Sequence, residues 1–294
     1  MAAAPISADY SAITTIGDAG KPCEDTVCLF NQEYAEDNIS AIDSYIVNCK
    51  ELTKLWVPGA TILTPEFSRL LLLGYVSATE SFFRKIFRSI INTDAQAKAD
   101  SHSYVVPFGA VLYHNKETIA EALLEGYSFA SEKDVRGAVS KFLGVSNIND
   151  ESLKSMLSEY EKICHLRHCC VHRFGKLGTQ NGIALGLEQH SKALEKPLAL
   201  TKDQLGEIAN WLLSFAKAMN NYFFRTLLDR SANEKNEYAI KWSWNYSKDK
   251  AKFNRFYKLF ATVKDTLPSP VETVLYERFK AVASKRKSTA AKVG

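Results

Sequence analysis

The sequence predicts an all-α protein built as a helical bundle. Three observations predict this class. Apolar residues recur at helical spacing along most of the chain, residues that favour helix N-termini precede these segments, and glycine or proline interrupts them. The 294 residues can bury a sizeable core, and a content of 46% hydrophobic and 24% charged residues is ordinary for a globular protein.

The N-terminal part begins without a pattern and then becomes strongly helical. Residues 1–30 show no sustained period, so we expect an irregular arm there. A helix is expected over Asn31–Trp56, where the sequence VPGA breaks the pattern. A long helix should follow Thr64, with Pro65 at its first position. The run Leu70–Val76 is apolar on nearly all sides, which indicates that this helix is central and buried.

Shorter elements are expected in the middle of the chain. The segment Tyr104–Leu112 is apolar, but Pro107 and Gly109 interrupt it, and we expect a loop or a short extended piece. Asn115 and Ser131 have the side chains of helix N-caps, so a short helix should follow each of them.

The second half of the chain contains two long helical patterns. The first should start near Asn149 and have its last turn at His172–Phe174, because Gly175 then interrupts the pattern. A turn-rich stretch that contains residues 183–187 leads to Thr201, the expected N-cap of a helix that runs to about residue 229.

The C-terminal part mixes aromatic and basic residues. We expect a helix from about Glu237 to Lys264, a turn at Pro268-Ser269-Pro270, and a last helix from about Val271 to Lys285. The basic tail after it is expected to be disordered.

These patterns divide the chain into four parts. They are an irregular arm (1–30), a helical domain (31–230), a C-terminal helical extension (231–286) and a disordered basic tail (287–294).

The composition favours a cytoplasmic protein with reduced thiols. Six cysteines in a chain of this length do not form the dense pattern of a small disulfide-stapled secreted domain. The N-terminus lacks the pattern of a signal peptide, and no apolar run is long enough to span a membrane. The net charge of +4 permits contact with nucleic acid without predicting it.

The densest group of reactive side chains is Cys164–Arg173, near the end of one expected helix. A metal site is one interpretation, because Cys164, His168 and His172 share a helix face. Against this interpretation, the sequence offers no second group of metal ligands elsewhere. Another interpretation is a structural one, in which the cysteines fill the core and the basic residues lie at its rim. This does not explain why arginines and histidines are so concentrated.

A third interpretation comes from a resemblance. Arg167-His168-Cys169-Cys170-Val171-His172 resembles the R-x(4–6)-H signature of the HEPN superfamily, in particular its RHxxVH form. The segment from Ser77 to Lys85 resembles an earlier helix of that family, in which a glutamate and a basic residue four positions later support the active site. Glu80 and Arg84 match those positions. The two matches cover about a third of the chain.

The resemblance implies an HEPN-like bundle with additional N- and C-terminal helices, and a ribonuclease that needs no metal or cofactor. Arg167, His172 and Glu80 would be catalytic, with Arg84 on the phosphate. His168 and Arg173 are candidates for support or RNA contact, and simple surface exposure is the alternative for each. Glu80 and Arg84 could equally form an exposed i,i+4 ion pair.

The chemistry suits these residue types. In RNA cleavage the 2′-hydroxyl attacks the adjacent phosphorus, which requires proton transfers and compensation of negative charge. Histidine transfers protons near neutral pH, and arginine binds two phosphate oxygens as a permanent cation. On an ideal helix Arg167 and His172 lie roughly 140° apart around the axis and about 7.5 Å apart along it. Two copies facing across a twofold axis would present two arginines and two histidines to one cleft, so we expect a homodimer.

Two further segments are candidates for RNA contact. Trp242–Tyr246 and the lysines that follow mix aromatic and basic side chains, which can stack on bases and hold phosphates, although a solvated lysine face is the more common explanation. The basic residues 285–287 would add a weak, salt-sensitive attraction.

The leading hypothesis is a toxin or effector ribonuclease in bacterial antiphage defence, with RNA as substrate and an antitoxin or sensor protein as a possible partner. The main alternative is a non-catalytic helical module that binds RNA, a nucleotide or a protein. A metal-dependent hydrolase is the third.

Overall fold

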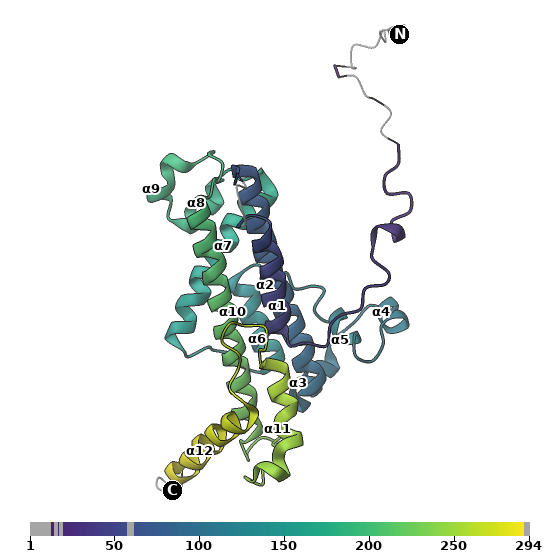
Figure 1. Cartoon of the computed structure of the whole chain (residues 1–294), viewed down its shortest axis with the longest axis vertical. Helices are drawn as coiled ribbons and strands as arrows, with labels where there is room; N and C mark the ends of the chain where they lie inside the picture. Colours follow the sequence, from purple (N-terminus) through teal and green to yellow (C-terminus); the bar gives the residue numbers. More distant parts are fainter. Residues whose placement is uncertain (1–12, 15–16, 18–19, 58–61, 291–294) are drawn as a thin grey trace. The chain divides into compact units, whose positions relative to one another are not determined.

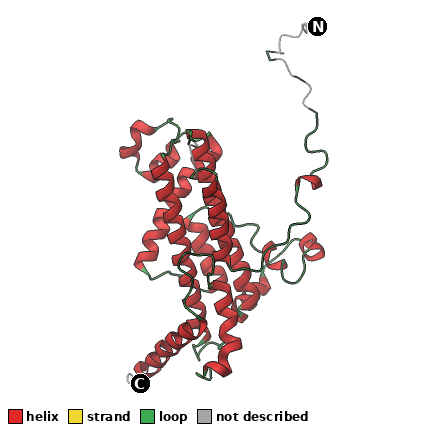
Figure 2. Ribbon diagram, in the orientation of Figure 1, coloured by secondary structure: helices red, strands yellow, loops and turns green. Residues whose placement is uncertain are grey.

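Every regular element in the described part of the chain is a helix, and only two isolated β-bridges occur there (Figure 2). The computed structural model describes residues 13–14, 17, 20–57 and 62–290. Contacts divide the chain into two units, Met1–Asn38 and Ile39–Gly294. The prediction of an all-α protein is confirmed.

The second unit contains the helices that Figure 1 labels. They are α1 (Ala41–Lys54), α2 (Pro65–Thr93), α3 (Ala95–Asp100), α4 (Phe108–Tyr113), α5 (Ile119–Ala122), α6 (Glu132–Leu143), α7 (Glu151–Arg173), α8 (Thr179–Leu185), α9 (Leu187–His190), α10 (Lys202–Ser231), α11 (Tyr246–Phe260) and α12 (Glu272–Ala290). None of these helices, within the described residues, has the length and hydropathy that a membrane-spanning segment needs.

Helix α2 is the centre of the bundle, as the sequence predicts. Thr64 caps it by accepting a hydrogen bond from the Phe67 amide at 3.2 Å, and Pro65 occupies its first turn. Helices α1, α7 and α10 pack along it, and its inward side chains are fully buried.

An aromatic cluster fixes how the helices around α2 are placed. The Phe83 ring of α2 lies 5.8 Å from Phe215 of α10, 6.2 Å from Tyr160 of α7 and 5.9 Å from Phe129, between ring centroids. Each such pair contributes about 0.5–1.5 kcal/mol beyond its buried area. The cluster therefore holds α7 beside α2 at a defined rotation.

A buried carboxylate joins the start and the end of the helical unit. Asp43 of α1 is 3% exposed and accepts hydrogen bonds from the Thr262 hydroxyl and from the backbone amides of Val263 and Lys264. The loop between α11 and α12 is thereby fixed to the first turn of α1.

Two expected helices are shorter than the sequence suggested. The helix expected over Asn31–Trp56 starts only at Ala41, because Ser40 accepts the Asp43 amide and caps it. The helix expected from Glu237 starts at Tyr246. Asp249 accepts the amides of Ser243 and Trp244, which therefore need no helical partner.

Other local expectations were wrong for similar reasons. The segment Phe108–Tyr113 is the helix α4 rather than a loop, with Pro107 at its N-cap. Asn115 caps a turn, accepting the amides of Glu117 and Thr118, and α5 begins only after Thr118. The stretch expected to be turn-rich contains the end of α8 and the start of α9, which meet at Gly186.

The two ends of the chain differ in how far they are described. Residues 1–12, 15–16 and 18–19 of the expected arm lie outside the described residues, and its described part contains a short 3-10 turn, Val27–Leu29. Helix α12 runs to Ala290, so residues 287–290 of the tail expected to be disordered are helical, and 291–294 lie outside the described residues.

Candidate active site

The candidate site lies where the end of α7 meets α2. Helix α7 ends at Arg173 because Phe174 takes a left-handed conformation, with φ of 50°, and Gly175 follows with φ of 92°. The amides of Phe174 and Gly175 both donate to the Cys169 carbonyl, and the bond from Phe174 closes the six-residue span typical of a Schellman motif. His172 therefore lies in the last helical turn, where the sequence placed it.

Arg69 of α2 anchors this helix end. Its buried guanidinium lies 5.2 Å from the centre of the Phe174 ring and donates to the Leu198 carbonyl at 2.8 Å. Its Cδ atom would lie 2.4 Å from a Cβ atom on Gly175. No sequence motif singled out Arg69, and the one signal available for it was an arginine directly before the most apolar run of the chain.

Glu80 of α2 lies beside Arg167 of α7, as the resemblance implied. Glu80 Oε1 is 3.6 Å from Arg167 Nη2, and the two side chains are 22% and 26% exposed. The distance is too long for a hydrogen bond, and no other described residue donates one to that buried oxygen. Burial raises the pKa of Glu80, while the charges of Arg167 and Arg84 oppose this.

Three histidines follow one face of α7. The rings of His165 and His168 are 6.0 Å apart, and those of His168 and His172 are 6.2 Å apart. Burial, and then the charge of Arg167, lowers the pKa of His168, so its neutral form is favoured at neutral pH. His165 Nδ1 lies 2.9 Å from Asn181 Oδ1, a contact that joins α7 to α8. His172 is exposed.

Arg167 and His172 do not contact each other directly. Among the described residues, no hydrogen bond or ion pair joins them, and His168 lies between them along the helix. Neither side chain is enclosed: Arg167 keeps a quarter of its surface exposed and His172 more. Both can therefore be reached by a large substrate.

No family model, curated protein or solved structure matches this chain. The chemistry of the site therefore follows from its own residues. Arg167 supplies a permanent positive charge, His172 an accessible imidazole, and Glu80 a carboxylate that can orient the guanidinium.

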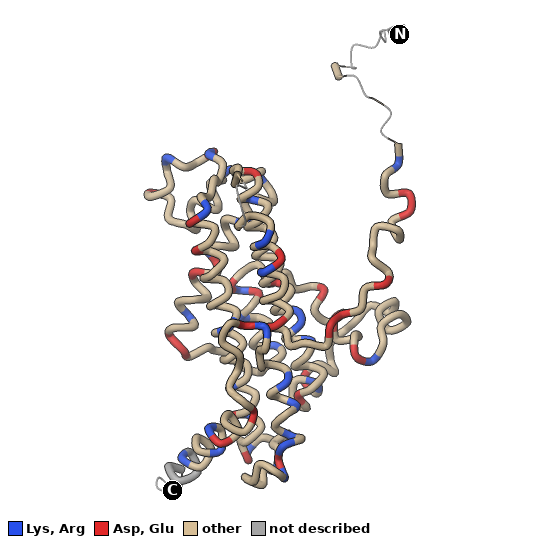
Figure 3. The backbone as a smooth tube through the Cα atoms, in the orientation of Figure 1, with Lys and Arg blue, Asp and Glu red and all other residues tan. Residues whose placement is uncertain are grey.

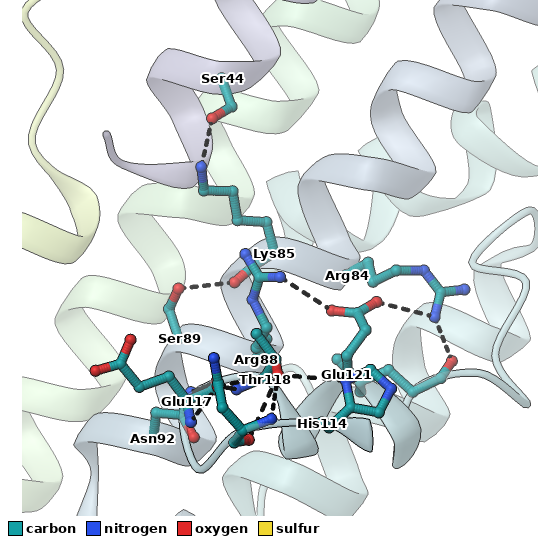
Figure 4. A network of polar contacts seen from close by, with 12 residues as sticks. Ser44, Arg84, Lys85, Arg88, Ser89, Asn92, His114, Glu117, Thr118 and Glu121 are labelled. Atoms are coloured by element: carbon teal, nitrogen blue, oxygen red, sulfur yellow. Dashed lines mark hydrogen bonds and ion pairs between the residues drawn. The ribbon is translucent and has the colours of Figure 1, made fainter. Parts of the chain in front are cut away.

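Arg84 and Arg173 have structural partners of their own. Arg84 donates to the carbonyls of Leu124 and Tyr127 at 2.8 Å each and lies 3.4 Å from Glu121 (Figure 4). Arg173 forms a 2.8 Å ion pair with Glu195. Arg84 holds the segment after α5, and Arg173 holds the loop after α7. None of these partners belongs to the Arg167–Glu80 pair. The ion pair between Glu80 and Arg84, which was the alternative for these two residues, does not form among the described residues.

The set of residues considered for a metal ion does not converge. Cys164 is fully buried, and burial raises its pKa to about 12, whereas His172 is exposed at the surface. The described residues contain no group of three or more His, Cys, Asp or Glu side chains arranged to hold a metal ion. Cys169 and Cys170 are also buried, as the structural interpretation of the cysteines expected.

Proposed function

We propose that this protein is an endoribonuclease that cleaves RNA by attack of the 2′-hydroxyl, without a metal ion in the reaction. One observation carries the proposal. The guanidinium of Arg167 lies 3.6 Å from the carboxylate of Glu80 and keeps a quarter of its surface exposed, and the imidazole of His172, in the last turn of the same helix, is exposed to solvent.

Each group has a role in a balanced reaction. A neutral imidazole takes the proton of the 2′-hydroxyl as the 2′-oxygen bonds to phosphorus and the bond from phosphorus to the 5′-oxygen breaks. A protonated imidazole returns a proton to the leaving 5′-oxygen. Arg167 compensates the extra negative charge on phosphorus. The products carry a 2′,3′-cyclic phosphate and a 5′-hydroxyl.

Two copies of the chain would complete the site. One helix separates Arg167 from His172 by about 140°, so in this arrangement the guanidinium and the imidazole that act on one phosphate come from different copies. A homodimer that faces two α7 ends toward one cleft would supply two imidazoles and two guanidinium groups. Following the resemblance, we place this dimer in the cytoplasm, as a toxin or effector of bacterial antiphage defence under the control of an antitoxin or sensor protein.

The test compares RNA cleavage in EDTA by wild type, His172→Ala, Arg167→Ala and the matched control His102→Ala, which removes an exposed histidine from another part of the bundle. We expect a loss of at least about 100-fold for His172→Ala and for Arg167→Ala, the lower end of what a general base or a charge-stabilising group contributes. The control should keep its rate. Equal rates for wild type and His172→Ala would contradict the proposal, as would products that end in a 3′-hydroxyl.

A further inference from the structure

Helix α11 has the strongest charge imbalance of any helix in the described residues. Its 15 residues include five basic residues and one acidic residue, Asp249. The basic residues are Lys248, Lys250, Lys252, Arg255 and Lys258. Figure 3 shows the Lys and Arg positions in blue along the segment that Figure 1 labels α11.

The one acidic residue of α11 does not neutralise this charge at the surface. Asp249 is fully buried, and it accepts hydrogen bonds from the Trp244 amide at 2.9 Å and the Tyr276 hydroxyl at 2.7 Å. Its carboxylate therefore belongs to the junction between α11 and α12.

Three lysines of α11 are left exposed and without an ionic partner. Lys248, Lys250 and Lys258 lie at the surface, and within the described part of the chain none of them forms an ion pair. Some exposed lysines of other helices are paired within their own helix: Lys54 lies 2.6 Å from Glu51, and Lys162 lies 2.6 Å from Glu159. The outer face of α11 is therefore an uncompensated cationic surface, which we call the α11 basic face and define by these three lysines.

The aromatic residues before α11 do not belong to this surface. Trp242 and Trp244 pack against Phe279 of α12, with ring centroids 5.2 and 5.5 Å apart. No large apolar side chain is exposed between Ile240 and Thr262. A helix that inserts into a membrane surface needs exposed apolar residues, and protein interfaces are built around apolar or aromatic anchors and are depleted in lysine. Cationic side chains without apolar neighbours fit a polyanionic backbone instead.

We propose that the α11 basic face is a second nucleic-acid surface that binds the phosphate backbone of RNA without reading its sequence. The choice of RNA as the polyanion rests on the proposed function. The expectation that Trp242 and Trp244 would stack on bases is replaced by phosphate binding alone, because those rings are packed against α12.

The fold separates this surface from the candidate active site. Arg255 of α11 donates to the Thr93 carbonyl at the last residue of α2. Arg69, near the start of α2, contacts the end of α7. The 24 residues between Arg69 and Thr93 span about 36 Å of helix, and the 13 residues between Glu80 and Thr93 span about 20 Å. An RNA must be long enough to span these distances to reach both places on one subunit.

The experiment measures RNA binding in the His172→Ala background, in which the RNA should stay intact. The test variant is Lys248→Gln/Lys250→Gln/Lys258→Gln, and the matched control is Lys54→Gln/Lys154→Gln/Lys162→Gln, which removes the same charge from three lysines that are paired with glutamates. Fluorescence anisotropy with labelled RNAs of about 6 and about 30 nucleotides, between about 50 and 200 mM salt, gives the affinity and its salt dependence.

We expect the test variant to bind the long RNA at least about tenfold more weakly and to lower the log–log salt slope by about 2, which corresponds to three lost phosphate contacts. The control should keep the wild-type slope. The triple Lys→Arg variant at the test positions keeps the charge and should restore binding, which separates charge from folding.

Two results would overturn the inference. In one, the test variant and the control lose affinity equally. In the other, the test substitutions abolish binding to phosphatidylserine vesicles while RNA binding is unchanged. The outcome is independent of cleavage: if the otherwise wild-type protein leaves RNA intact but the α11 basic face binds it, the proposed function fails and this inference stands. If cleavage occurs and the three lysines do not matter for RNA binding, the proposed function stands and this inference fails.

Discussion

At the scale of single residues, the carboxylate of Glu80 beside Arg167 lowers the stability of the fold at the candidate site. A carboxylate oxygen that is buried without a hydrogen bond costs free energy in the folded state. The nearby guanidinium offsets this only in part, since burial still raises the pKa of Glu80. A charge that the fold keeps under such conditions fits a role in orienting Arg167.

This arrangement predicts how Glu80→Gln changes stability with pH. The folded pKa of Glu80 lies above its unfolded value, so its stabilising contribution is complete at acidic pH and is lost as the pH rises through the folded pKa. The amide of glutamine does not titrate. We therefore expect the Tm of Glu80→Gln, relative to wild type, to increase from about pH 4 to about pH 7.

The control for this prediction has the opposite sign. Glu66 has a lowered pKa, first because its carboxylate accepts its own backbone amide, so Glu66→Gln should lose stability relative to wild type over the same range. Thermal unfolding followed by circular dichroism gives both differences. A fall in the relative Tm of Glu80→Gln toward neutral pH would show that the ion pair with Arg167 outweighs burial.

At the scale of elements, the end of α7 depends on a close contact with α2. The left-handed turn at Phe174 and Gly175 and the methylene groups of Arg69 leave no room for a side chain at position 175. The direction of the last turn, and with it the position of His172, follows from this contact.

Two glycine substitutions test this contact. Gly175→Ala places a methyl group 2.4 Å from Arg69 Cδ at a φ of 92°, and we expect it to cost about 1–3 kcal/mol. Gly137→Ala, inside α6, meets no atom within 4 Å and should raise stability by about 0.5–1 kcal/mol. Urea unfolding measures both. Equal effects of the two substitutions would show that the contact between α2 and α7 does not restrain this turn.

Local sequence rules located the long helices but not the contacts between them. Thr64 before Pro65, and Thr201 before α10, predicted helix starts because a side-chain cap acts within three residues. Helices α1 and α11 begin later than predicted because a side chain, Ser40 or Asp249, accepts hydrogen bonds from backbone amides near the start of the helix.

The candidate site was only partly legible in the sequence. Glu80 and Arg167 could be paired through a family resemblance, although 87 positions separate them along the chain. The roles of Arg84 and Arg69 could not be inferred, because the carbonyls that they bind come from distant segments whose path no local pattern specifies.

At the scale of the whole molecule, one subunit presents an incomplete set of groups for the proposed reaction. A single chain packs its helices around an aromatic core, and its α7 offers one guanidinium and one accessible imidazole. A shared site predicts that two differently damaged subunits can complement each other.

Complementation can be measured with mixed dimers. Arg167→Ala and His172→Ala should each be inactive alone, and tagged heterodimers of the two should recover part of the cleavage rate, because one subunit then supplies the guanidinium and the other the imidazole. The control is the His172→Ala dimer in which the two subunits carry different tags. Activity no higher than in this control would show that each subunit must carry both groups.

The hydrogen bonds that Asp43 accepts from the loop between α11 and α12 affect when the chain can finish folding during its synthesis. Its partners at Thr262, Val263 and Lys264 are synthesised more than 200 residues after it. A ribosome adds about 5–20 residues each second, so about ten seconds or more pass between the synthesis of Asp43 and the synthesis of its hydrogen-bond donors. Until then this junction stays hydrated, and it closes only after the loop between α11 and α12 has been made.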